Sequence, residues 1–140
     1  MFNEKTNAIA VKINNTYKPD MTDFQLYDTC RTAWDIDKEK RSILKYVVAV
    51  CNGEIIDVFK VSAWVDAGTT LNTINTEDKI VSAETRSEFV GKFAEDEIRD
   101  KYKGTQLTDY AEKSYGNFVY MNVNKNQSLT RKLYFYKYIW

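Results

Sequence analysis

The sequence predicts an α+β fold, in which a small antiparallel, barrel-like sheet is combined with two or three short helices. The first observation is a hairpin signal, because two runs rich in Val, Ile, Tyr and Phe flank Asn52-Gly53 between Lys45 and Val61. The second is that neither face of this hairpin is polar enough to lie wholly in water, so both must be covered. The third is the order of the predicted elements, which runs strand, helix, hairpin, strands, helix, strands.

The first elements are a strand and a capped helix. Residues 8–13 form the strand, and the turn around Pro19 separates it from the helix. Thr22 opens the helix, and Gln25 three residues later completes a capping box. Arg31 lies at the edge of the buried stripe of this helix. That stripe, at helical spacing, consists of Phe24, Tyr27, Cys30 and Trp34.

The hairpin has a predicted register. A two-residue turn of type I′ needs positive φ at both central positions, which Asn and Gly tolerate best. This turn places Tyr46 opposite Phe59, and it places Phe59 on the same face as Val48 and Val50. It also makes two pairs next to the turn, Cys51 with Glu54 and Val50 with Ile55.

The second half of the chain is predicted to add three strands and one helix. Trp64 precedes a small-residue loop and is expected at the rim of the sheet, and residues 71–82 form a polar loop. Residues 86–93 form a strand in which Gly91 marks a bulge or a close backbone approach. Residues 95–103 form a helix with acidic residues at its start and Gly104 at its end. The last strands are residues 118–123 and 129–140.

The predicted organisation is one domain, residues 1–122, extended by an aromatic strand at residues 123–140. In that extension Tyr134, Tyr136, Tyr138 and Trp140 alternate onto one face. A terminal strand with such a face favours a homodimer or larger homo-oligomer through Leu129 to Trp140. The alternative is that a helix of the same domain covers this face.

Composition excludes several classes of function. Twenty Lys and Arg balance twenty Asp and Glu, which makes bulk duplex nucleic acid an unlikely ligand. The sequence contains no histidine, which removes His-based triads, Cys–His pairs and nearly every catalytic zinc geometry. No apolar run approaches the ~20 residues that cross a bilayer, and the first ten residues do not resemble a secretion signal. We therefore expect a cytoplasmic protein (host cytoplasm if viral), with no membrane partner and with Cys30 and Cys51 reduced.

Several short motifs resemble, in residues and spacing, one family of small bacterial and phage proteins. They are Tyr17-Lys18-Pro19-Asp20-Met21-Thr22, Leu26-Tyr27-Asp28-Thr29-Cys30-Arg31 with Trp34, Lys45-Tyr46-Val47-Val48-Ala49-Val50 with Gly53, Ser62-Ala63-Trp64, Ala67-Gly68-Thr69, and Glu88-Phe89-Val90-Gly91 with Glu97-Ile98-Arg99 and Lys101-Tyr102. The family is similar to PUA/EVE-type small barrels, which implies a barrel-like sheet and a nucleotide or modified base as ligand. The chain departs from the family at Thr32, where Gly is usual, and at Asn117-Phe118, where Asn-Pro is usual.

Five side chains are the candidate ligand-binding residues: Arg31, Trp34, Trp64, Arg86 and Glu88. Indole rings stack on bases, Arg pairs with phosphates or base edges, and a Glu carboxylate accepts from an exocyclic amine. The alternative is structural, with both Trp residues in the core, Arg31 capping a helix end, and Arg86 paired with Glu88 on one strand face. No catalytic residue, metal ligand or cofactor is assigned.

Three functions from different classes remain. The first is a non-enzymatic module that binds a nucleotide or nucleobase, in its sharpest form a phage sponge that sequesters a nucleotide immune signal and so evades immunity. The second is a metal- or carboxylate-dependent nuclease or phosphodiesterase. The third is a protein–protein adaptor with an aromatic surface. The absence of a recognisable catalytic constellation favours the first, and whether the protein is an enzyme stays open.

Overall fold

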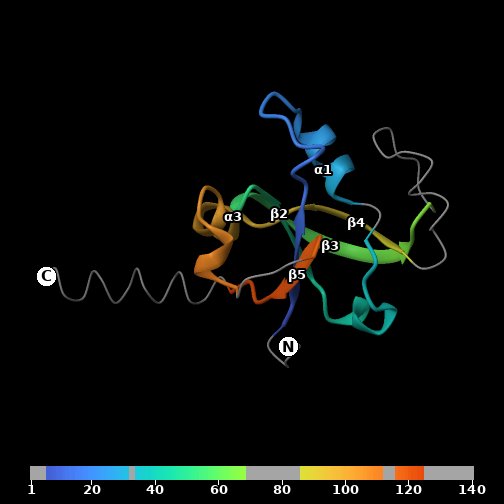
Figure 1. The fold of residues 1–140 in the computed structure, drawn as a ribbon. Helices are drawn as coiled ribbons and strands as arrows, with labels where there is room; N and C mark the ends of the chain where they lie inside the picture. Colours follow the sequence, from blue (N-terminus) through green and yellow to red (C-terminus); the bar gives the residue numbers. More distant parts are fainter. Residues whose placement is uncertain (1–5, 32–33, 69–85, 112–115, 125–140) are drawn as a thin grey trace, which may run out of the picture.

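The computed structural model of the chain describes residues 6–31, 34–68, 86–111 and 116–124. Its centre is a five-stranded sheet in the order β4-β3-β2-β1-β5 (Figure 1). Within these residues two α-helices and two short 3-10 helices accompany the sheet, so the α+β class is confirmed. In chain order the elements are β1 (Ala8–Lys12), α1 (Asp23–Cys30), η1 (Lys38–Ser42), β2 (Tyr46–Cys51), β3 (Glu54–Asp66), β4 (Ser87–Phe93), α3 (Asp96–Tyr102), η2 (Leu107–Asp109) and β5 (Phe118–Met121).

The sheet is mixed, which corrects the prediction of a purely antiparallel sheet. β1 runs parallel to β2, from the pair Ala8–Tyr46 to the pair Lys12–Val50, while the other pairings are antiparallel. The cause is the long connection through α1 and η1, because a crossover returns the chain to the end of the sheet from which it started. Within the described residues β4 and β5 are the two edges and no strand pairing closes the sheet. The barrel-like form therefore stays a prediction.

The β2–β3 hairpin has the predicted turn but a different register. Asn52 and Gly53 have φ of 50° and 85°, as a type I′ turn requires, and the pairs next to the turn are those expected. Beyond them the register shifts, because a bulge adds Ile56 to β3. Since side chains alternate along a strand, one extra residue moves every later residue to the other face. Phe59 therefore pairs with Val47 rather than Tyr46, and the predicted face was wrong.

Each face of the sheet carries its own apolar cluster, and a different helix covers each. On one face α3 contributes Ile98 and Tyr102 to a cluster with the β2 and β3 side chains Val48, Val50 and Val58. On the other face α1 contributes Leu26 and Cys30 to a cluster that includes Val47 and Phe59. Figure 1 shows the two helices on different sides of the central strands. Coverage of both hairpin faces, predicted from their apolar composition, is confirmed.

A buried ion pair joins α3 to the sheet. Asp57 is a charged residue among the apolar side chains of β3, and it is almost fully buried. Arg99 of α3 donates from Nε and Nη2 to its two carboxylate oxygens, both at 2.9 Å. This bidentate hydrogen bond to Asp57 raises the pKa of Arg99. The acidic-to-basic helix predicted at residues 95–103 is thus present, and one of its basic residues fixes it to β3.

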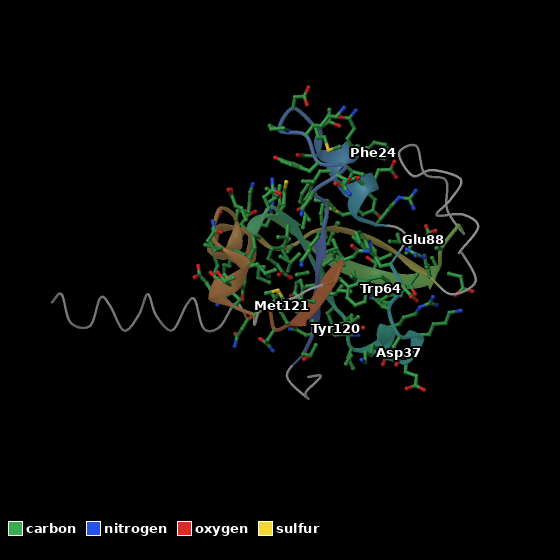
Figure 2. The ribbon with its side chains drawn as sticks, viewed as in Figure 1. Phe24, Asp37, Trp64, Glu88, Tyr120 and Met121 are labelled. Carbon is green, nitrogen blue, oxygen red and sulfur yellow. The ribbon has the colours of Figure 1, made fainter. Side chains whose placement is uncertain are left out.

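The helix α1 begins as predicted but ends early. The Gln25 N–H donates to Thr22 Oγ1 at 3.2 Å, and the Thr22 N–H donates to Gln25 Oε1 at 2.9 Å, which is the predicted capping box. Phe24 is 62% exposed, so its assignment to the buried stripe was wrong; Figure 2 shows it on α1, away from the sheet. Trp34 is buried but lies beyond the helix end, in an extended segment that pairs with Ser87 at the start of β4.

Gly91 lies at a close approach between β3 and β4, as predicted. A Cβ atom on Gly91 would lie 2.2 Å from the backbone oxygen of Lys60, which no real packing permits. The register shifts next to it, between Val61 and Ala63. The N–H of Gly91 donates to the Tyr27 hydroxyl of α1 at 3.0 Å, which also fixes the helix against β4.

Two predicted segments cannot be compared with the structure. The loop at residues 71–82 and the strand at residues 129–140, with the oligomer interface assigned to it, lie outside the described residues. The described chain extends to Asn124, and Val123 is buried in the core, where its N–H and C=O are bonded to the side chain of Asn7. Within the described ranges the helices are too short to cross a membrane.

The hairpin turn provides a test of its conformation. Gly53→Val is expected to lower the free energy of unfolding by about 1 kcal/mol or more, because a β-branched residue is strained at φ of 85°. Space is not limiting, since the nearest atom to a Cβ, Gln106 Oε1, lies 3.7 Å away. Gly53→Asn is the matched control, because Asn tolerates positive φ and is expected to cost clearly less. Urea denaturation of both variants measures the difference, and equal losses would contradict the φ argument.

Candidate functional site

A cavity of about 410 Å³ lies where the end of β1, the last turn of α1 and the start of β5 meet. Trp34 and Asp35, which follow α1, and Arg86, which precedes β4, complete its wall. The cavity thus takes residues from next to both edges of the sheet, since Phe118 begins β5 and Arg86 directly precedes β4. Its lining consists of Lys12, Ile13, Asn15, Thr16, Thr29, Trp34, Asp35, Arg86, Asn117 and Phe118.

Backbone hydrogen bonds fix the wall on the β1 side. The N–H of Lys12 donates to the Asn117 oxygen at 2.9 Å, which joins β1 to the segment that enters β5. The N–H of Ile13 donates to the Val50 oxygen at 2.8 Å, so the end of β1 is also held by β2. A turn then follows, in which the N–H of Thr16 donates to the Ile13 oxygen at 3.1 Å. The position of Lys12 and of the polar turn is therefore set by the sheet itself.

The wall on the opposite side is built around Trp34. Its indole Nε1 donates to the Cys30 oxygen at the end of α1 at 2.7 Å, which fixes the ring. Its backbone N–H and C=O are bonded to the C=O and N–H of Ser87, at 2.9 and 2.8 Å. Trp34 is therefore a core residue, as the structural alternative predicted, and it also lines the cavity; its role in ligand binding stays a prediction.

Arg31, another candidate, lies in a buried ion network. It is 4% exposed, and its Nε donates to Asp28 at 2.8 Å while its Nη1 donates to Glu88 at 2.7 Å. Glu88 is fully buried, and its second carboxylate oxygen accepts the N–H of Gly68. A buried charge requires a partner, and these charges find theirs in one another. Their bonds therefore connect α1, β4 and the segment that follows β3. Neither Arg31 nor Glu88 lines the cavity.

Trp64 also lies outside the cavity lining. Its Nε1 donates to the Leu44 oxygen at 2.8 Å, and its ring packs on Phe89 with the ring centroids 5.6 Å apart. Figure 2 labels Trp64 and Glu88 at the same end of the sheet, where the register places Val65 opposite Glu88. Of the five candidates the structure thus brings Trp34 and Arg86 together in one cavity, and it gives Arg31, Trp64 and Glu88 structural partners. A ligand-binding role for those three stays a prediction.

A second group of charges supports the start of β4 beside the cavity. Arg41 donates from Nε and Nη2 to the hydroxyl of buried Ser87, at 2.9 and 2.6 Å, and from Nη2 to Asp66 at 2.8 Å. Lys38 lies 3.1 Å from the same carboxylate. The hydrogen bonds from Arg41 and Lys38 lower the pKa of Asp66. These contacts hold the β4 end of the cavity wall and leave Asp66 charged at neutral pH.

Sequence reasoning missed most of the cavity. Lys12, Thr29 and Phe118 were assigned to a strand, a helix and another strand, without a role at a site. Lys12 has one recognisable signal, because it is the charged residue of an otherwise apolar strand, AIAVK. Thr29 and Phe118 have none, since nothing in a single sequence shows that α1 ends next to β5.

The carboxylates do not form an acid–base pair at this site. Asp35 is the one carboxylate among the described residues that line the cavity. Asp57 and Glu88, which a sequence search for paired carboxylates would consider, bind different Arg residues on different helices or helix ends. Across the described residues no group of three or more Cys, Asp or Glu is placed to hold a metal ion.

Comparisons with family models, with curated proteins and with solved structures find no match for the chain. The geometry of the cavity is therefore the basis for a functional proposal.

Proposed function

We propose that the protein is a non-enzymatic binding module for a nucleotide or a nucleobase, and that the cavity is its ligand site. The observation that carries this proposal is the composition of the lining. Trp34 and Phe118 supply aromatic rings, and Lys12 and Arg86 supply cations. Aromatic rings can stack on any of the bases, and cations bind phosphate. A lining that offers both rings and cations therefore suits a nucleotide better than a lining with only one of them.

The size of the cavity favours one small ligand. About 410 Å³ falls near the lower end of the range of about 300–1,000 Å³ that is usual for small-molecule sites. A nucleic acid strand needs instead a long basic groove, whereas this chain has equal numbers of acidic and basic residues. The proposal also includes the PUA/EVE-like, barrel-like curvature of the sheet. It is supported by the fact that residues next to both sheet edges line one cavity.

Binding is favoured over hydrolysis because the lining holds a single carboxylate among the described residues. General acid–base hydrolysis by carboxylates uses two of them, one to donate and one to accept a proton. Asp35 alone supplies one. A module that sequesters a nucleotide signal, the sharpest form of this hypothesis, needs a deep pocket and tight binding but no second carboxylate.

The test is a panel of nucleosides and nucleoside monophosphates titrated into the full chain by isothermal calorimetry. We expect at least one member to bind, and chromatography of the mixture to recover it unchanged. Phe118→Leu keeps apolar volume but removes the ring, and should weaken binding about tenfold, since stacking contributes about 1–3 kcal/mol per base. Arg86→Ala should also weaken binding. Lys92→Ala is the control, because Lys92 is exposed on β4 and does not line the cavity.

The contrary outcomes are distinct. No binding by any member of the panel would overturn the proposal. Conversion of the ligand would replace it with an enzymatic function. Trp64→Ala could lose binding while it keeps its stability, and Phe118→Leu could bind normally. That pair of results would place the site near Trp64 rather than in this cavity.

A further inference from the structure

We infer that Tyr120 is a positioning residue of the cavity, which holds the Phe118 ring in the orientation that stacks on the base of the ligand. This inference rests on the proposed function and adds to it a residue outside the cavity lining. Phe118 and Tyr120 lie two residues apart on β5, so their side chains project from the same face of the strand. Phe118 lines the cavity, whereas Tyr120 does not.

The rings of Phe118 and Tyr120 meet edge to face. Their centroids lie 5.6 Å apart, and their planes are inclined by 68°. Aromatic pairs prefer this arrangement, because the positive edge of one ring meets the negative face of the other. Both residues pair with β1, Phe118 with Val11 and Tyr120 with Ile9, and both pack against the apolar cluster on the α1 side of the sheet. Because the two rings are only partly buried, their mutual contact restricts the rotation of the Phe118 ring where the core alone does not.

The short helix η1 fixes Tyr120 in turn. The Lys40 ammonium lies over the Tyr120 ring, 4.6 Å from its centroid, which is a cation–π contact. Burial raises the pKa of Tyr120 and outweighs a hydrogen bond with the backbone of Asp37, so the phenol stays protonated at neutral pH. Asp37 is the N-cap of η1, and Figure 2 labels it in the same part of the molecule as Tyr120. Tyr120 is thus held both at its hydroxyl and at its ring.

The same helix also supports the opposite wall of the cavity. Arg41 of η1 donates to the hydroxyl of Ser87, the residue that follows Arg86 in the chain, and Arg86 lines the cavity. A side chain that is ordered before the ligand arrives loses less conformational freedom on binding. Tyr120 therefore contributes to affinity through Phe118 rather than through a ligand contact of its own.

A double-mutant cycle tests this role. The probes are the four common nucleosides and their 5′-monophosphates, titrated into the full chain by isothermal calorimetry, and the cycle uses the tightest binder. Tyr120→Leu should weaken its binding about three- to tenfold, which corresponds to the usual strength of an edge-to-face pair. Tyr120→Phe keeps the ring and should bind within about twofold of wild type. In a Phe118→Leu background, Tyr120→Leu should cause no further loss, because the ring that Tyr120 positions is absent.

Val119→Ala is the matched control for the stability of β5. Val119 packs against the cluster on the other face of the sheet and does not line the cavity. This change should lower the free energy of unfolding, measured by urea denaturation of every variant, and leave binding unchanged. If Tyr120→Leu does not fold, Tyr120→Met, whose side chain is longer and fills more of the same space, takes its place in the cycle.

The outcomes separate this role of Tyr120 from the proposed function. Failure of wild type to bind any probe overturns both. Binding by Tyr120→Leu that equals wild type, or losses that multiply in the double variant, retains the proposed function but overturns the role of Tyr120. Binding by Tyr120→Phe as weak as that by Tyr120→Leu overturns the ring contact as the cause. Equal weakening by Val119→Ala would also overturn it, since general destabilisation of β5 would then explain the effect.

Discussion

Arg31→Met is expected to lower the free energy of unfolding by about 3–5 kcal/mol. The change removes the guanidinium that bonds both Asp28 and Glu88, and both carboxylates are about 1% exposed. Breaking a buried ion network costs far more than forming it gains, because the remaining charges cannot return to water. Urea denaturation followed by circular dichroism measures the loss.

Two control variants separate burial from charge. Lys60→Met removes a cation from an exposed pair with Glu95, and is expected to lower the free energy of unfolding far less, because solvent screens such a pair. Arg31→Lys keeps the charge but not the planar fork that bonds Asp28 and Glu88 at once, so an intermediate loss is expected. A loss in Arg31→Met no larger than that in Lys60→Met would show that the network does not stabilise the fold.

Gly91→Ala is expected to lower the free energy of unfolding by about 2–3 kcal/mol, the upper part of the usual range for overpacking. The new Cβ would meet the Lys60 backbone oxygen at 2.2 Å, and also the backbone of Val61, so β3 and β4 must separate. No flexible side chain is available to move aside, since all three nearest atoms belong to the backbone. Separation would also lengthen the bond from the Gly91 N–H to Tyr27.

Gly116→Ala is the matched control for this effect. The nearest atom to its Cβ, the Phe118 oxygen, lies at 3.9 Å, which is an ordinary contact. The change should be nearly neutral, because only the gain from a less flexible unfolded chain remains. Equal losses in the two variants would contradict a close approach at Gly91.

Local signals predicted the local structure correctly. Asn52-Gly53, the capping box at Thr22 and the close approach at Gly91 each depend on a few neighbouring residues, and all three are present. The bulge at Ile56 was missed because both faces of the hairpin are apolar, so moving the later residues to the other face leaves the hydrophobic pattern almost unchanged. The parallel β1–β2 pair was missed because strand patterns do not show direction.

The candidate site was predicted only in part, because a single sequence does not show which distant residues meet in the fold. Trp34 and Arg86 were found because their side chains suit a base and a phosphate wherever they lie. Arg31 and Glu88 have equally suitable side chains, but they are 57 residues apart in sequence and bind each other. A charged residue next to apolar ones in a strand, as Asp57 in β3 and Lys12 in β1, was the better signal. Here Asp57 forms a buried ion pair with Arg99, and Lys12 lines the cavity.

The central position of β1 has a consequence for how the chain folds as it is synthesised. β1 is the first of the described elements in sequence, yet one of its two neighbours, β5, is the last of them, and Asn7 bonds Val123 across 116 residues. Until β5 leaves the ribosome, β1 has an unpaired edge of apolar residues that invites pairing with other chains. Closing such a long loop is entropically costly and slows folding. The sheet can therefore be completed only after β5 has been synthesised, and β1 is expected to be prone to mispairing until then.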